Sequence, residues 1–291
     1  MSKLIMLCGI PGSGKSEFAK SLKECGYIIC SSDEMRHRLF GDASSQVDNE
    51  EVFRRLHEDI FANLRRGENV VYDACNINSK RRRAFLNTLK TKRIKCEKEA
   101  YVIATPYEIC LEQNRERERV VPDEAITRMY RHWQTPAKWE GFDHVRLITT
   151  IPHFGFDARL YDGYDQNNPH HKCTLGKHLR MTAEYVADKV DDDILYNAAL
   201  RHDLGKPFCE VKDENGISHY PDHSGVGAWD VLNDWEFDDD DVLEISRLIT
   251  YHMYPIFWRG NQKTADKYKT LWGKEFYSKI MLLHEADVCN Y

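Results

Sequence analysis

The sequence predicts an α/β domain built on a parallel sheet, followed by an all-α domain. In the first half, short apolar runs rich in strand-forming residues alternate with helical patterns, which is typical of parallel strands covered by helices. From about Thr174 onward, apolar residues recur at three- and four-residue steps, which is the period of amphipathic helices. The length of 291 residues, near twice the commonest domain size, also favours two domains.

Five apolar runs are expected to form the strands of the first domain: Leu4–Cys8, Tyr27–Cys30, Val70–Tyr72, Ala100–Ala104 and Val145–Ile148. A helical stretch, Glu17–Glu24, follows the first strand after a short loop. Near residue 155 the sequence becomes polar and rich in turn-forming residues. We therefore expect the first domain at residues 1–152, a linker at about 153–164 and the second domain at residues 165–291.

Helical periodicity in the second domain is clearest from Leu175 to Val186 and again from Ile194 to Leu200. The acidic run Asp238–Asp241 is interpreted as the start of a helix, because carboxylates are stabilised at the positive end of the helix dipole.

The net charge of -6 is unevenly divided. Lys and Arg exceed Asp and Glu by 26 to 22 over residues 1–150, whereas over residues 151–291 they number 15 against 25. Nine of the 13 histidines also lie in the second half. A mildly basic half fits a polyanionic partner, and an acidic half rich in histidine fits metal cations. A solvated surface explains each balance equally well from charge alone.

Composition excludes several classes of protein. Hydrophobic residues make up 42% and charged residues 30%, which is ordinary for a globular protein and excludes disordered, collagen-like and coiled-coil chains. No apolar run reaches the roughly 18 residues that span a bilayer, and the N-terminus lacks the length of a signal peptide. We therefore expect a cytoplasmic protein that does not enter membranes. Nine cysteines without a CxxC pair are expected to be reduced packing residues.

The segment Gly9-Ile10-Pro11-Gly12-Ser13-Gly14-Lys15-Ser16 fits the phosphate-loop pattern GxxxxGK[ST]. It follows an expected strand and precedes an expected helix, as that loop requires. We expect ATP or another nucleoside triphosphate to bind here, with the backbone around Gly9, Gly12, Ser13 and Gly14 holding the phosphates. Lys15 would neutralise the transferring phosphoryl group, and the Ser16 hydroxyl would ligate Mg²⁺.

Three further clusters bear on what accepts the phosphate. The second strand runs into Asp33 and Arg36, which could serve as a proton acceptor and a phosphate-binding cation. An N-cap aspartate beside a surface arginine is the alternative. The third strand ends at Asp73, ahead of Asn76 and the basic run Lys80–Arg83. Finally, Asn114–Arg119 carries three arginines, which could form a lid over the nucleotide or an ion-paired helix face.

Over about residues 3–150, these motifs resemble the polynucleotide 5′-kinase family, the P-loop kinases of phage and bacterial RNA repair. The features that carry the resemblance are the phosphate loop, Asp33 with Arg36, and the stretches Asp73–Arg82, Asn114–Arg119 and Val121–Phe142.

The resemblance implies ATP and Mg²⁺ at Lys15 and Ser16, Asp33 as general base, and Arg36 and Asp73 at the acceptor. It also implies a lid arginine that contacts the nucleotide and stabilises the transferring phosphoryl group. Arg117 is the first choice, with Arg115 and Arg119 as alternatives.

The second half contains histidines and aspartates in the order H…HD…H…H…D. His202 and Asp203 are adjacent near the end of an expected helix, and an imidazole and a carboxylate so placed can reach one or two cations. The other members are His178, His223, His252 and Asp287. Any single histidine here is more often a satisfied polar residue than a ligand.

This order, with HDLGKP at 202–207 and DHSGVGA at 222–228, resembles the HD phosphohydrolase superfamily, whose members are α-helical and bind divalent metals. The resemblance implies one metal at His178, His202, Asp203 and Asp287, and a second at His223 and His252 with Asp203 bridging. In a one-metal variant, His223 and His252 would bind substrate instead.

Lys206 would contact phosphate in this domain. Mn, Fe, Ni, Co and Zn all remain open as the metal. Four further histidines are interpreted as surface or supporting residues: His170, His171, His219 and His284.

Together the two resemblances imply an α/β P-loop kinase domain followed by an all-α HD domain, as in fusions that heal RNA ends. The expected function is ATP-dependent phosphorylation of 5′-OH ends of RNA or DNA, plus removal of a 2′-phosphate or 2′,3′-cyclic phosphate. A separate ligase would then join the ends, and a homo-oligomer is left open. Two alternatives are a small-metabolite or nucleoside kinase fused to an HD nucleotidase, and an ATP-gated regulator with a degenerate HD module.

Overall fold

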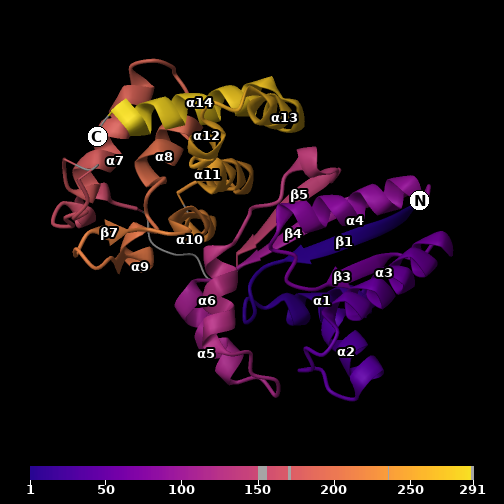
Figure 1. The fold of residues 1–291 in the computed structure, drawn as a ribbon. Coiled ribbons are helices and arrows are strands. Elements are labelled where there is room, and N and C mark those ends of the chain that lie inside the picture. Colours follow the sequence, from indigo (N-terminus) through magenta and orange to yellow (C-terminus); the bar gives the residue numbers. More distant parts are fainter. Residues whose placement is uncertain (150–155, 170–171, 235, 290–291) are drawn as a thin grey trace. The chain divides into compact units, whose positions relative to one another are not determined.

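The computed structural model describes residues 1–149, 156–169, 172–234 and 236–289 (Figure 1). The chain divides into two compact units: the first comprises residues 1–129 and 136–151, and the second comprises residues 130–135 and 152–291. Residues 130–135, which the sequence places in the first domain, thus cluster with the second. Part of the expected linker, residues 153–155, lies outside the described residues, as do His170 and His171.

The first unit holds a five-stranded parallel sheet in the order β2-β3-β1-β4-β5. Its strands are β1 (Ser2–Cys8), β2 (Ile28–Ser31), β3 (Val70–Asp73), β4 (Cys96–Ala104) and β5 (His144–Thr149). All five predicted strands and their parallel arrangement are therefore confirmed. The helices of this part of the chain are α1 (Lys15–Glu24), α2 (Ser32–Phe40), α3 (Asn49–Arg65), α4 (Ser79–Thr91), α5 (Tyr107–Arg115), α6 (Asp123–Arg131) and the 3₁₀ helix η1 (Lys138–Glu140).

Helices pack on both faces of this sheet. On one face, Ala19 of α1 packs against Ile5 and Val71. The next strand residue, Tyr72, points to the opposite face because side chains alternate along a strand. There its ring lies 5.0 Å from that of Phe85 in α4 and 5.5 Å from that of His57 in α3, measured between centroids. Helix α1 therefore covers one face, and α3 and α4 cover the other.

Since the strands are parallel, their carboxyl ends lie along one edge of the sheet. Cys8, Ser31, Asp73 and Ala104 end four of the strands at this edge, and the loops that follow them carry the predicted site residues. Parallel pairing thus brings together segments that lie far apart in the sequence.

The second unit is mainly helical, as predicted. Its helices are η2 (Ala158–Tyr161), α7 (Leu175–Ala187), α8 (Asp193–Arg201), α9 (Lys206–Cys209), α10 (His223–Asp230), η3 (Val231–Asn233), α11 (Asp239–Tyr251), α12 (Tyr254–Trp258), α13 (Gln262–Trp272) and α14 (Lys274–Cys289). A two-stranded antiparallel hairpin, β6 (Val211–Lys212) with β7 (Ser218–His219), departs from the all-α expectation.

The acidic run begins a helix as interpreted from the sequence. Asp238 caps α11, and its carboxylate accepts hydrogen bonds from the backbone N–H groups of Asp240 and Asp241. All nine cysteines carry free thiols. Among the described residues, no helix has both the length and the apolar character needed to cross a membrane.

Candidate active sites

The phosphate loop turns the chain from β1 into α1. Gly12 and Gly14 adopt left-handed backbone conformations with φ of 84° and 91°. A Cβ atom at Gly12 would lie 2.0 Å from the Cys110 carbonyl oxygen, so no other residue fits there. At Gly9 the limit is packing, because a Cβ would lie 2.6 Å from Ser13 Oγ. The Gly9 N–H also donates to Cys75 O at 2.9 Å, which ties the start of the loop to the residues after β3.

Lys15 and Ser16 begin α1. The buried Lys15 ammonium donates to Ile10 O at 2.7 Å and lies 3.4 Å from Ser13 Oγ, which places it inside the curve of the loop. Ser16 is exposed in the first turn of the helix. Backbone N–H groups at a helix N-terminus together with a lysine ammonium form a binding site for phosphate.

A cavity of about 1460 Å³ opens beside this loop within the first unit. It is larger than the roughly 300–1,000 Å³ typical of sites for one small ligand. The predicted site residues that line it are Gly12, Gly14, Lys15, Ser16, Asp33, Arg36, Asp73, Arg117 and Arg119. The structure therefore brings the phosphate loop, the acceptor candidates and two lid arginines to one space.

Asp33 lies in the first turn of α2 without capping it. The cap is Ser31, whose Oγ accepts a hydrogen bond from Asp33 N at 3.2 Å. Arg36, the neighbour one turn along, is buried. The alternative of a capping aspartate beside a surface arginine is therefore wrong. The Asp33 carboxylate instead faces arginines: Arg36 Nη1 lies 3.1 Å from Oδ1, Arg119 also contacts Oδ1, and Arg117 Nη2 lies 3.9 Å from Oδ2.

Arg36 is held from two sides. Its Nη1 donates to Asp33, and its Nη2 donates to Asn49 Oδ1 at 3.0 Å. The guanidinium carbon also lies 5.9 Å from the centre of the Phe53 ring. Burial lowers the pKa of Arg36, and Asp33 partly opposes this. Sequence patterns gave no signal for Asn49 or Phe53, because both come from α3 and act only through the fold.

Asp73 is the last residue of β3 and lines the cavity. Burial raises the pKa of its carboxyl group, and the nearby Lys15 ammonium opposes the shift. The chain then turns through Asn76, which has a positive φ of 47° and donates from Nδ2 to Leu7 O at 2.8 Å. This bond ties the turn to β1 and so fixes where Asp73 lies relative to the phosphate loop.

Arg82 has a structural role that the sequence did not reveal. Its Nε and Nη2 donate to the Glu140 carboxylate at 2.7 and 2.6 Å, and both side chains are fully buried. Its Nη1 donates to Asn76 O at 2.8 Å. A buried ion pair that loses one partner leaves an uncompensated charge. This contact joins the stretch Asp73–Arg82 to the stretch around Glu140.

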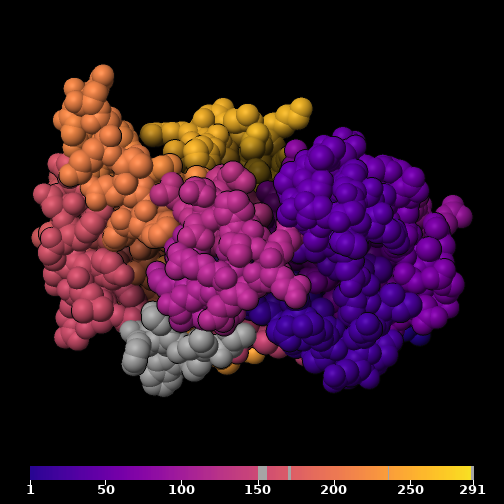
Figure 2. Space-filling model, turned by 90° about the horizontal axis from the view of Figure 1, so that it is seen from below, coloured from indigo at the N-terminus to yellow at the C-terminus, as the bar shows by residue number. Residues whose placement is uncertain are grey.

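The loop that follows α5, residues 116–121 and named the lid loop here, is bridged at its base by one side chain. The buried Asn114 donates to Val121 O at 2.8 Å and accepts from Val121 N at 3.0 Å. Arg115 is exposed and pairs with Asp123 at 2.8 Å, whereas Arg117 and Arg119 contact Asp33. Figure 1 shows the loop after α5 extending toward α2, and Figure 2 shows magenta and indigo parts of the first unit side by side. Arg117 and Arg119 are therefore better placed than Arg115 for a role at the cavity.

The second unit brings all six predicted ligands together from five helical segments. His178 lies in α7, His202 and Asp203 directly follow α8, and Asp287 lies in α14. The remaining two are His223, the first residue of α10, and His252, the residue after α11. All six are buried.

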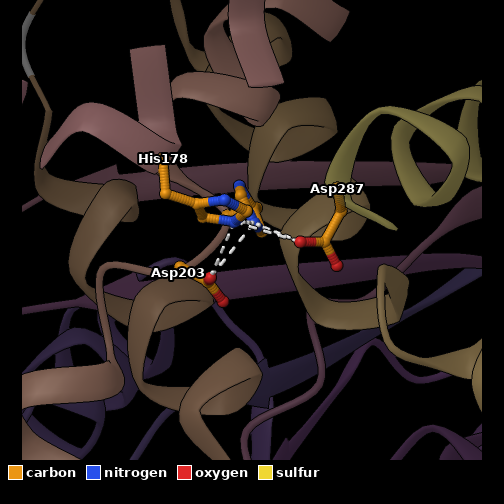
Figure 3. A group of neighbouring side chains, drawn as sticks. His178, Asp203 and Asp287 are labelled. Carbon is orange, nitrogen blue, oxygen red and sulfur yellow. Dashed lines mark hydrogen bonds and ion pairs between the residues drawn. The ribbon is translucent and has the colours of Figure 1, made fainter. Parts of the chain in front are cut away.

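In one group of four ligands, the ring nitrogens of two histidines face the oxygens of two carboxylates (Figure 3). His178 Nε2 lies 3.0 Å from Asp287 Oδ1 and 3.4 Å from Asp203 Oδ2. His202 Nε2 lies 3.2 Å from Asp203 Oδ2 and 3.4 Å from Asp287 Oδ1. These four side chains each offer an atom to a common point, an arrangement that can hold a metal ion.

A second group lies on the other side of Asp203. His223 Nε2 lies 3.1 Å from Asp203 Oδ1, and His252 Nε2 lies 3.7 Å from the same atom. The two ring nitrogens are 3.1 Å apart. Asp203 therefore directs Oδ2 at the first group and Oδ1 at the second, which is the arrangement of a bridging ligand.

Backbone carbonyls fix the histidine rings for metal binding. Nδ1 of His202 lies 2.7 Å from Ala199 O, and Nδ1 of His252 lies 2.8 Å from Ile249 O. His223 repeats this contact with Tyr220 O at 2.8 Å. A carbonyl only accepts, so each Nδ1 carries a proton, which leaves Nε2 as the ring nitrogen that can face a metal. The donor set therefore fits one or two divalent transition metals.

The electrostatics of this cluster favour bound positive charge. Burial opposes ionisation of Asp203, but His202 and Lys206 hold its pKa well below the usual range. Burial likewise opposes ionisation of Asp287, whose pKa is kept low by hydrogen bonds from His178 and His202. The carboxylates therefore remain ionised within a buried site, which is what a cation needs.

Lys206 lies against the shared ligand. Its Nζ is 2.5 Å from Asp203 Oδ2 and donates to Gln166 Oε1 at 2.8 Å. Gln166 gave no signal in the sequence. His219 is exposed beside Asp213 at 3.1 Å, and His284 is half-buried in α14, so neither belongs to the ligand groups.

Fold and loop define the first unit as a P-loop domain of kinase-like α/β architecture. The family described as "AAA domain" matches residues 4–136. UPF0200 proteins of Saccharolobus islandicus and Saccharolobus solfataricus are 46% identical over 57 residues, which is 19% of this chain and 30% of each relative. The chain thus spans less than a third of the length of these curated relatives.

Two solved structures match larger regions of the chain. The Pnkp1/Rnl/Hen1 RNA repair complex is 24% identical, with 44% of this chain and 42% of that chain covered and a TM-score of 0.37. A gluconokinase from Sinorhizobium meliloti is 16% identical, with 52% of this chain and 84% of that chain covered and a TM-score of 0.36.

Proposed function

We propose that the chain is a bifunctional enzyme that heals broken polynucleotide ends. The first unit would phosphorylate a 5′-hydroxyl end of RNA or DNA with ATP. The second would be an HD-type, metal-dependent phosphohydrolase that removes a 2′-phosphate or opens a 2′,3′-cyclic phosphate. The observation that carries the proposal is that one chain combines a phosphate loop facing an Asp–Arg acceptor site with two ligand groups that share a carboxylate.

In the kinase reaction, Lys15 and the loop N–H groups hold the β- and γ-phosphates, and the Ser16 hydroxyl is placed to ligate Mg²⁺. The acceptor hydroxyl loses its proton to Asp33 as its oxygen forms a bond to the γ-phosphorus, and the bond from that phosphorus to the bridging oxygen breaks. Arg36 and Asp73 position the acceptor. Arg117 and Arg119 exchange their contacts with Asp33 for contacts with the transferring phosphoryl group.

In the phosphohydrolase, four ligands would hold one cation: His178, His202, Asp203 and Asp287. His223 and His252 would hold a second cation with Asp203 shared. A divalent metal bound there supplies Lewis acidity for phosphate hydrolysis. Lys206 orients Asp203 and offers a cation next to the phosphate, and the backbone carbonyls keep each ring fixed during turnover.

The two activities cooperate only on opposite ends of a break. A kinase and a phosphatase that shared one end would undo each other's work. A strand with a 5′-hydroxyl and a 2′,3′-cyclic phosphate needs one phosphate added and another opened or removed before a separate ligase can join it. End healing therefore gives both sites a common substrate.

A kinase for a small hydroxyl metabolite or nucleoside, fused to an HD nucleotidase, is the second candidate. The mild charge of the first half favours it, because nucleic-acid-binding domains are commonly strongly basic. Residues 1–150 carry 26 basic against 22 acidic residues.

Competition for labelled γ-phosphate between a 5′-hydroxyl RNA oligonucleotide and free nucleosides tests the kinase proposal. We expect the oligonucleotide to be phosphorylated in preference to nucleosides at equal concentration. Preferential labelling of a nucleoside or sugar would contradict end healing and support the second candidate. For the other unit, release of phosphate from a 2′-phosphorylated oligonucleotide, dependent on added Mn²⁺, Ni²⁺ or Co²⁺, is the expected result.

A further inference from the structure

The basic charge of the first half is concentrated in one segment. Residues 74–96 contain eight Lys and Arg and no Asp or Glu, whereas the rest of residues 1–150 contains 18 basic and 22 acidic residues. This segment comprises α4 and the residues on either side of it. A segment of 23 residues whose charged side chains are all positive can form the kind of surface that attracts a polyanion.

One face of α4 borders the acceptor cavity. Arg81, Ala84, Phe85 and Thr88 all line it, and their spacing of three and four residues places them on one side of the helix. Lys92, which caps the helix, lies 11 residues after Arg81 and so returns to nearly the same side. Its ammonium is 5.7 Å from the centre of the Phe61 ring, on the side of α3.

The cations on this side are available to a ligand. Arg81 and Lys92 are exposed there, and Lys80, which is also exposed, lies about a quarter of a turn from Arg81 at the N-terminal end of α4. Within the residues that the structure describes, Arg82 is the member of the basic run that pairs with a carboxylate, and it is buried. Lys90, also exposed, lies nearly half a turn away from Arg81 and faces away from the cavity.

We propose that the α4 strip, formed by Lys80, Arg81 and Lys92, binds the phosphates of a single-stranded polynucleotide whose 5′-hydroxyl end enters the cavity. The inference rests on the proposed kinase function and specifies its acceptor. The strip extends over roughly 16 Å of helix, longer than one nucleoside, so a small metabolite in the cavity would leave most of it unused. Charge complementarity identifies the occupant as a polyanionic strand.

The cavity wall next to the strip suits the terminal nucleotide. The half-buried Phe53 lines the cavity together with Arg81, and aromatic rings are surfaces on which unpaired bases stack. The strand would thus be held by a ring at its end and by cations along its backbone. This combination binds single strands with little preference for base sequence.

Phosphorylation of acceptors of increasing length tests the strip. The acceptors are a nucleoside 3′-monophosphate and 5′-hydroxyl oligonucleotides of two, four and eight residues. We expect KM to fall at least about tenfold from the shortest to the longest acceptor, since successive phosphates reach the strip. Arg81→Glu should remove most of this fall, and Lys92→Glu should remove part of it.

Lys90→Glu is the matched control, because it changes the net charge of the same helix by the same amount on the opposite face. It should leave the dependence of KM on length intact. In ATP-free anisotropy titrations of the eight-residue strand, Arg81→Ala should lower the slope of log K against log salt by about 0.7, the value for one lost phosphate contact. Arg81→Lys should restore most of the affinity.

Different outcomes separate this inference from the kinase proposal. Phosphorylation of the mononucleotide with a KM that does not change with length would overturn the strip and leave the kinase standing. Equal loss of binding in Arg81→Glu and Lys90→Glu would also overturn the strip, since general attraction would then suffice. If no hydroxyl acceptor is phosphorylated but binding still depends on Arg81 and not on Lys90, the strip stands and the kinase proposal fails.

Discussion

The two candidate sites differ in how their charged groups are held. In the first unit, side chains from α1, α2, the end of β3 and the lid loop face a cavity of about 1460 Å³, and Asp33 is paired with arginines that include two from the lid loop. In the second unit, the ligands are buried, and three histidine rings are fixed by the carbonyl three residues earlier. The first arrangement suits substrates that enter and leave, and the second suits an ion that stays bound.

The largest effect is expected where one residue serves both ligand groups. Asp203→Ala removes an oxygen from each group, so metal content and phosphate release should fall by at least about 100-fold, since loss of even a supporting partner costs 10–100-fold. Metal analysis by mass spectrometry after dialysis, with phosphate release assayed in parallel, measures both. Asp191→Ala, which removes an exposed carboxylate of the same unit, should change neither. A variant at 203 that keeps its metal and its phosphate release would show that Asp203 is not a ligand shared by the two groups.

The next effect concerns the proton acceptor of the open site. Asp33→Asn should lower kcat by about 100-fold or more, because the amide cannot take up the proton, while the affinity for ATP stays near the native value. Steady-state kinetics combined with fluorescent nucleotide binding separates the two quantities. Glu34→Gln, an exposed neighbour, is the control. Loss of ATP binding with unchanged kcat would assign Asp33 to the nucleotide side of the cavity.

The three arginines of residues 115–119 are expected to differ in how much each contributes to kcat of the kinase reaction. Arg119→Ala and Arg117→Ala should each lower kcat by roughly 10- to 100-fold, since each removes a cation aimed at the cavity. Arg115→Ala should change kcat less than about twofold, because Arg115 forms an exposed pair with Asp123. Single-turnover kinetics at saturating ATP measures the chemical step. The reverse order, with Arg115 dominant, would mean that the lid loop rearranges on binding.

The smallest effect is a change in the free energy of unfolding caused by His57. This histidine is half-buried in the first unit and is not one of the ligand histidines of the second unit. Burial lowers the pKa of His57 to about 4, and its Nε2 lies 3.0 Å from Tyr72 OH. The unfolded chain therefore takes up the proton first, near pH 6.5, and stability is lost as the pH falls from about 6.5 to 4, by roughly 1–3 kcal/mol. His57→Gln should flatten this part of the pH dependence in urea titrations of the metal-loaded protein. An unchanged slope would mean that His57 is charged in the folded state.

The sequence was a good guide to the first unit because its signals are local. Alternating strand and helix patterns located all five strands, and the phosphate loop is one contiguous motif. Local patterns did not show that Ser31 caps α2, that Arg82 pairs with Glu140, or that Arg119 contacts Asp33. The cap is a local contact, but the other two join segments whose proximity depends on the packed sheet.

In the second unit, local sequence signals were a weaker guide to the site. Single residues at His178, His252 and Asp287 carry no local signal, and they were grouped with the motifs around His202 and His223 by resemblance in order. The structure places them around Asp203, and it adds Gln166, which no pattern indicated. Ligands distributed over separate helices meet only after the helices pack, so their distances could not be read from spacing.

One measurement tests the central claim that two independent sites act on opposite ends of one break. An RNA oligonucleotide with a 5′-hydroxyl and a 2′,3′-cyclic phosphate is incubated with protein, ATP, Mg²⁺ and Mn²⁺, and both ends are resolved by mass spectrometry. We expect a gain of one phosphate at the 5′ end and conversion of the cyclic phosphate at the other, with Lys15→Ala abolishing only the first change and Asp203→Ala only the second. An RNA that stays unchanged at both ends, in a sample that hydrolyses ATP and simple phosphoesters, would contradict end healing.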